Sequence, residues 1–126
     1  MFTRTELERK SIKELRNLCL HVYELKPIGN TAYKDSYINA LLVFPAIALR
    51  QIKAGTGYKR IRESHLDALG AIIEAIGSPT QEQKALLKVT MEGKTMEFPE
   101  RYDQEALLNL HVAKWYLQQA MLRLTM

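Results

Sequence analysis

The sequence has a single cysteine, Cys19, and no long apolar run. One cysteine excludes a disulfide framework within the chain, and its place among apolar residues predicts a buried thiol rather than a nucleophile. The longest apolar run, residues 40–49, contains Pro45 and has about half the length that crosses a bilayer. Charged residues occupy the first positions, where a secretory signal needs an apolar stretch. We therefore expect a cytoplasmic protein without membrane contact.

Motifs for metal binding and catalysis are also missing. The three histidines, His21, His65 and His111, lie far apart in the sequence. None has the His-x-x-x-His or Cys-x-x-Cys partner that makes a metal site specific. The loop around Gly55 and Gly57 lacks the spacing of a phosphate-binding P-loop. These absences predict a protein that is not an enzyme and that uses no cofactor or metal.

Helical patterns occupy most of the 126 residues. Apolar residues recur at three- and four-residue steps over residues 12–22, which indicates an amphipathic helix with a cationic outer face. Ser11 and Glu14 have the spacing of a capping box at its start. Thr5 and Glu8 have the same spacing and leave an earlier start open.

A loop follows this first predicted helix. Pro27 disfavours a helical residue before it, and Gly29 permits a positive φ at little steric cost. Thr31 is placed to cap a second helix, in which Tyr37 lies in register with Leu41 and is therefore expected in the core. The free amides at the start of such a helix favour an anion.

This arrangement resembles the SAP motif and the related N-terminal motif of transcription termination factor Rho, over about residues 11–42. In these families a helix of the type Leu-Arg-x-Leu precedes a loop with a glycine, a lysine that opens a second helix, and an Ile-x-x-Leu ending. The corresponding residues here are Leu15, Arg16, Leu18, Gly29, Lys34, Ile38 and Leu41. The resemblance implies a small helix, extended loop and helix that contacts nucleic acid.

The charge distribution agrees with a polyanionic partner. Residues 1–62 contain 12 Lys or Arg and 5 Asp or Glu, a net charge of +7, whereas residues 63–126 contain 6 and 9, a net charge of −3. Basic charge that gathers in one region is typical of a surface that faces phosphates. We predict contact with nucleic acid, DNA rather than RNA, through Lys13, Arg16, Lys26, Asn30, Thr31, Tyr33, Lys34, Lys59, Arg60 and Arg62.

We predict a mainly all-α fold, with the SAP-like motif in residues 1–44 and a helical core in residues 45–126 that forms one compact unit with it. Pro45 indicates either a kink or a new helix. Within the core, the apolar stripe of residues 66–76 predicts a helix that Gly77 ends.

Two further helices are expected after Gly77. Ser78 followed by Pro79 is typical of the start of the next one. Residues 89–98 alternate enough to suggest a small β-hairpin, and a continued helix that ends at Gly93 fits equally. The last helix is predicted from Asp103 to the C-terminus.

Apolar residues of this last helix lie on more than one side, which is typical of a helix that is central or packs against a second chain. We expect a homodimer through Leu108, Val112, Trp115 and Leu122. Two functional hypotheses remain. One is a small regulatory or architectural nucleic-acid-binding protein, and the other is a helical adaptor or subunit of a larger protein assembly without nucleic-acid contact. Steep weakening of binding by salt distinguishes the first from the second.

Overall fold

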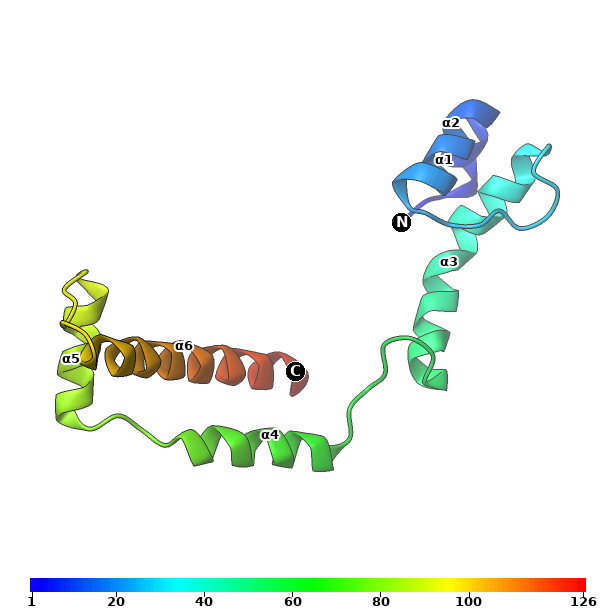
Figure 1. Ribbon diagram of the computed structural model, residues 1–126. Coiled ribbons are helices and arrows are strands. Elements are labelled where there is room, and N and C mark those ends of the chain that lie inside the picture. The colour runs from blue at the N-terminus through cyan, green and yellow to red at the C-terminus, as the bar shows by residue number, and fades with distance from the viewer. The chain divides into compact units, whose positions relative to one another are not determined.

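The computed structural model describes all 126 residues and contains six α-helices, one π-helical turn and no strand (Figure 1). The predicted mainly all-α fold is confirmed. The chain divides into two compact units, Met1–Arg60 and Ile61–Met126, called here the N-terminal unit and the C-terminal unit. The sequence placed a boundary after residue 44, whereas the units separate after residue 60.

Three helices and a π-helical turn make up the N-terminal unit. These are α1 (Arg4–Glu8), α2 (Ile12–Asn17), the turn η1 (Leu18–Val22) and α3 (Lys34–Ala54). Ser11 caps α2 as predicted, and its hydroxyl accepts a hydrogen bond of 3.1 Å from the backbone N–H of Glu14. A separate helix, α1, precedes α2. It begins with a capping box of Thr3 and Glu6, not with the Thr5 and Glu8 pair that the sequence offered as an earlier start.

The core of the N-terminal unit lies where α1, α2 and η1 meet the first half of α3. Its buried residues are Leu7, Leu15, Cys19, Tyr37, Ile38, Ala40 and Leu41. The predictions that Cys19 and Tyr37 are buried are confirmed. Leu15 and Cys19 of the predicted stripe thus form the contact between the two halves of the motif, since such steps keep side chains on one face of a helix, whereas Val22, at the end of the π-helical turn, is exposed.

Helix α3 continues through Pro45 without a break and ends at Gly55. Phe44, next to the proline, stacks on Tyr23 at a ring centroid distance of 6.2 Å, and Tyr23 also contacts Phe2 edge to face. These contacts hold the middle of α3 against the end of η1. Because the helix does not stop at Pro45, residues 45–54 belong to the N-terminal unit, which is why the boundary lies later than predicted.

The C-terminal unit consists of α4 (Glu63–Ile76), α5 (Gln81–Met91) and α6 (Glu100–Leu124). Helix α4 ends at Gly77 as predicted. Helices α4 and α6 lie side by side in Figure 1 and run antiparallel, because Lys114 of α6 bonds the carbonyl of Gly77 while Met121 lies against Gly70. Helix α5 packs against the first part of α6.

The predicted β-hairpin at residues 89–98 is wrong. Helix α5 continues to Met91, close to the alternative ending at Gly93, and its last carbonyls are taken locally: Gly93 N–H donates to Thr90 and Lys94 N–H donates to Val89. These amides are therefore not free to pair with a neighbouring strand.

Two helix starts also differ from the sequence prediction. Helix α5 begins two residues later than expected, because the reciprocal capping box that forms is that of Thr80 and Gln83, although Ser78 and Gln81 have the same spacing. Helix α6 begins directly after Pro99, earlier than the predicted cap at Asp103.

A buried amide organises the segment between α5 and α6. Gln104 is almost fully buried, and its side-chain nitrogen donates to the hydroxyl of Thr90 and to the carbonyl of Lys94, both at 2.9 Å. Its side-chain oxygen accepts a bond of 2.7 Å from the N–H of Met96. A single residue of α6 thus satisfies three polar groups of the preceding segment.

Candidate nucleic-acid interface

The loop between η1 and α3 has a defined backbone path. Gly29 adopts φ 112°, in the left-handed region that favours glycine. On either side, Ile28 N–H donates to the carbonyl of Ser36 at 2.9 Å, and the Ser36 hydroxyl donates to the carbonyl of Asn30 at 2.5 Å. The Asn30 side chain accepts a bond from Ala32 N–H. The loop is therefore bound to the first turn of α3.

Tyr37 connects this loop to the cationic face of α2. Its hydroxyl donates to the carbonyl of Thr31 at 2.7 Å and accepts a bond of 3.1 Å from Nε of Arg16. The guanidinium also lies over the tyrosine ring, 5.7 Å from its centroid. The structure thus brings Arg16 beside the loop residues that the sequence placed in the same site. Thr31 contributes its carbonyl here and does not cap α3, which begins after Tyr33.

Lys34 has a contact that the sequence did not predict. Its ammonium donates a hydrogen bond of 2.6 Å to the carbonyl of Glu8, at the end of α1. A cation at the C-terminal end of a helix is favourable because that end carries partial negative charge. Lys34 therefore links α1 to the start of α3, and its ammonium already has one partner within the protein.

Several exposed cations surround these contacts. Lys13 lies one turn from Arg16 on the exposed side of α2, and Lys26 is exposed in the loop. Arg9 and Lys10 directly follow Glu8, so Lys34 brings the start of α3 next to them. Arg9 and Lys10 are not among the residues that the sequence predicted to contact nucleic acid, although two consecutive basic residues before a helix cap are a visible signal.

Acidic partners for these cations are scarce. The one salt bridge within the N-terminal unit joins Arg4 to Glu8 at 4.0 Å. Tyr33 is 65% exposed next to the same loop and has no hydrogen bond from its hydroxyl. The N-terminal unit therefore presents exposed positive charge together with three exposed aromatic rings, those of Tyr23, Tyr33 and Tyr58.

The remaining predicted cations lie elsewhere. Lys59 and Arg60 follow the C-terminal end of α3, which begins at Lys34 and is 21 residues long, a helix of about 30 Å. They belong to the opposite end of α3 from the loop. Arg62 lies in the C-terminal unit, where it precedes α4 and its backbone N–H donates to the imidazole of His65.

The four residues predicted at an oligomer interface are all on α6. Leu108 is half-buried, whereas Val112, Trp115 and Leu122 are 38%, 54% and 58% exposed. The other apolar side of α6, with Leu117 and Met121, is half-buried beside α4. The structure therefore separates two apolar stripes on α6, and the predicted interface residues form the one that α4 does not cover.

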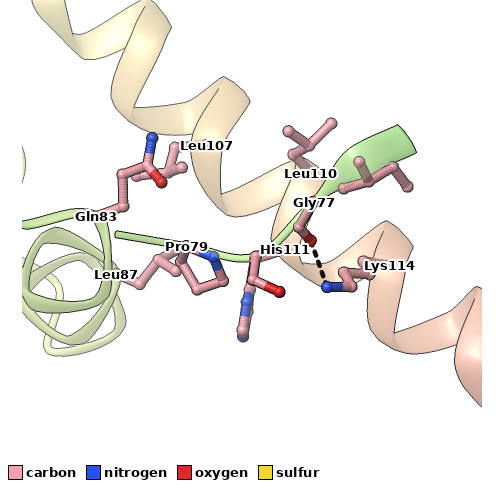
Figure 2. Close-up of a pocket in the computed structure, with 10 residues that line it drawn as sticks. Gly77, Pro79, Gln83, Leu87, Leu107, Leu110, His111 and Lys114 are labelled. Carbon is pink, nitrogen blue, oxygen red and sulfur yellow. Dashed lines mark hydrogen bonds between the residues drawn. The ribbon is translucent and has the colours of Figure 1, made fainter. Parts of the chain in front are cut away.

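A shallow pocket of about 100 Å³ lies in the C-terminal unit, where the end of α4, α5 and α6 meet (Figure 2). Leu87, Leu107 and Leu110 supply apolar walls, and Lys114 reaches the carbonyl of Gly77 across the pocket. That bond uses one N–H of the Lys114 ammonium and satisfies the backbone carbonyl of Gly77, directly after the end of α4. None of the residues predicted to bind nucleic acid lines this pocket.

The three histidines are exposed, and no group of three or more His, Cys, Asp and Glu side chains has the arrangement of a metal site. Burial raises the pKa of the Cys19 thiol above its ordinary value, and the thiol donates to the carbonyl of Leu25. None of the helices is both long enough and apolar enough to span a membrane.

Comparison with protein-family models, with curated proteins and with solved structures finds no match to this chain.

Proposed function

We propose that this chain is a small, non-enzymatic nucleic-acid-binding protein of regulatory or architectural type, and that its N-terminal unit contacts DNA in preference to RNA. The observation that carries the proposal is the unpaired positive charge of this unit. Residues 1–60 contain 11 Lys or Arg and 5 Asp or Glu, and Arg4 is the one cation among the 11 with a carboxylate within 4 Å.

The contact is mainly electrostatic. Arg16 offers a guanidinium that Tyr37 holds in place, and a planar guanidinium can bind a phosphate through two parallel hydrogen bonds. Lys13 and Lys26 are exposed ammonium groups on either side of it in the sequence. Neutralising phosphates releases condensed counterions, so affinity falls as salt rises. Tyr33 offers a ring on which an unpaired base can stack.

The protein acts as a homodimer through Leu108, Val112, Trp115 and Leu122 of α6. Three of these apolar side chains, Val112, Trp115 and Leu122, are exposed, which supports the proposal, because exposed apolar surface on a free chain favours association. A dimer carries two N-terminal units. Two weak sites on one molecule raise the apparent affinity through effective concentration.

The test is fluorescence anisotropy of the full chain with labelled duplex DNA, single-stranded DNA and RNA, each titrated at 50 mM and 200 mM salt. We expect binding that weakens steeply with salt, and strongest binding to duplex DNA. A variant with Lys13→Glu and Lys26→Glu is expected to weaken binding at least about tenfold, because it reverses two phosphate-facing charges. Both lysines are exposed, so the fold is retained.

The matched control is Lys84→Glu with Lys88→Glu. Both lysines are exposed on α5 of the C-terminal unit, and the pair changes the net charge by the same amount. If this control weakens binding as much as the N-terminal pair, only net charge matters and the proposed surface is wrong. Absence of binding at 50 mM salt overturns the function itself.

A helical subunit of a larger protein assembly is the second candidate. The observation that favours it is the exposed apolar surface of the C-terminal unit, which includes Ile72, Tyr102 and Tyr116. In that case the chain binds no nucleic acid, and an apolar protein interface responds little to salt. The same titration therefore separates the two candidates.

A further inference from the structure

Helix α6 carries two apolar stripes, and its own unit covers one of them. Leu107, Leu117 and Met121 are half-buried on the side that Lys114 and Met121 fix against α4. The second stripe, called here the α6 seam, consists of Leu108, Val112, Trp115, Gln119 and Leu122. Its first and fourth members are half-buried, and the other three are exposed. At 100° per residue the centre of the seam lies well over a quarter turn from the centre of the α4-facing stripe.

The spacing within the seam is that of a coiled coil. Its five residues follow one another at steps of four, three, four and three, the heptad alternation that keeps a narrow stripe facing a partner helix. Val112 and Gln119 then occupy a positions, while Leu108, Trp115 and Leu122 occupy d positions. A β-branched residue at a with leucine at d favours two strands over three or four.

The residues that flank the seam suit a second copy of the same helix. An interface between identical surfaces must not place like charges opposite each other. Only one of the flanking e and g positions holds a Lys, Arg, Asp or Glu, and these positions are Asn109, His111, Tyr116, Gln118, Arg123 and Thr125. Such flanks let two copies of α6 approach without repulsion along most of the seam.

From the spacing and the flanks we infer that the α6 seams of two copies form a two-stranded coiled coil, with Gln119 as a polar position inside it. The inference rests on the proposed dimer and is independent of nucleic-acid binding. Helix α6 is already folded against α4 and α5, so the short seam does not have to form its helix on association. A polar residue at one a position lowers stability and selects register and strand number.

Sedimentation equilibrium of the full chain over 1–200 µM tests the inference with a matched pair of variants. Trp115 in the seam and Ile72 on α4 are both 54% exposed. We expect the wild-type chain to dimerise. Trp115→Asp is expected to raise the dimer dissociation constant at least about hundredfold, because a buried charge replaces a central aromatic contact. Ile72→Asp is expected to change the dissociation constant less than threefold. Circular dichroism verifies that both variants remain helical.

A second variant, Gln119→Leu, keeps the inference testable if Trp115→Asp fails to fold. Removing the polar a position is expected to tighten association at least about tenfold or to admit trimers and tetramers. The control is Ala113→Leu, which lies on α6 outside the seam and its flanks. Glu105→Leu would not serve, because Glu105 pairs with Arg101.

The outcomes separate the inference from the dimer and from the proposed function. A wild-type monomer at 200 µM overturns both the dimer and the seam, while anisotropy still decides DNA binding. A wild-type dimer that Trp115→Asp leaves intact, or that Ile72→Asp breaks equally, overturns the seam alone. A Gln119→Leu variant with unchanged association also overturns it.

Discussion

Nε of Arg16 donates to the hydroxyl of Tyr37 at 3.1 Å, and the same hydroxyl donates to the carbonyl of Thr31 at 2.7 Å. One buried phenol therefore joins the cationic face of α2 to the loop before α3. A tyrosine hydroxyl can donate and accept at once, which is why a single side chain serves both groups.

Tyr37→Phe is expected to lower the free energy of unfolding by about 1–2 kcal/mol, because it leaves the Thr31 carbonyl and the Arg16 guanidinium without a protein partner. Urea unfolding followed by circular dichroism measures the loss. Tyr33→Phe is the control, since the Tyr33 side chain is exposed. Equal stability of the two variants would contradict the role given to the Tyr37 hydroxyl.

Gly29→Ala is expected to destabilise the N-terminal unit by about 1–3 kcal/mol, since a non-glycine residue at this φ is strained. The added Cβ would also lie 3.0 Å from Oγ of Ser36, which is bonded to Asn30. Gly57→Ala is the comparison, because Gly57 has positive φ but open space around it. Urea midpoints of the two variants test whether Gly29→Ala is the more costly change.

Gln104→Leu is expected to destabilise the C-terminal unit by about 2–4 kcal/mol. The substitution leaves the N–H of Met96, the carbonyl of Lys94 and the hydroxyl of Thr90 without the amide that binds them. Thermal unfolding gives the magnitude, and hydrogen exchange at Met96 reports the segment directly. Gln118→Leu, at an exposed position of α6, should cost far less; a similar cost would show that the buried network contributes little.

The Cys19 thiol is expected to make stability depend on pH in the alkaline range. Burial raises its pKa above the ordinary value of 9.0, so the folded state holds the proton more tightly than the unfolded state. This contribution to the unfolding free energy is complete below pH 9 and is lost as the pH rises through the raised pKa of the folded state. Urea midpoints from pH 7 to pH 10.5 measure the decline.

Tyrosines and lysines also titrate in this range, so Cys19→Ala is the reference. It is expected to start from a lower stability, because it removes part of a packed core, and to show a shallower alkaline decline than wild type. Parallel curves for the two proteins would mean that the thiol does not carry the pH dependence.

Local signals in the sequence were the reliable ones. Ser11 caps α2 and Gly77 ends α4 as predicted, because a cap depends on a few neighbouring residues. The hairpin at residues 89–98 was wrong, because alternation over a few residues does not show whether the backbone amides have a strand to pair with. Here the end of α5 and the Gln104 side chain take several of them.

The candidate site was predicted in part. Arg16, Asn30 and Thr31 are brought together through Tyr37 and Ser36. Lys59 and Arg60 lie at the other end of α3. Their place depends on the length of an unbroken helix, and Pro45 left that length open in the sequence.

By itself, the sequence determined the mainly helical fold, the stripes that build the core around Leu15 and Leu41, and the concentration of basic charge before residue 62, because each follows from residue type and periodicity. Only the tertiary structure decided that Lys34 binds the carbonyl of Glu8 and that α4 covers one stripe of α6 while Val112, Trp115 and Leu122 of the α6 seam stay exposed. Those outcomes depend on which distant segments meet, and periodicity within one helix carries no information about its partner.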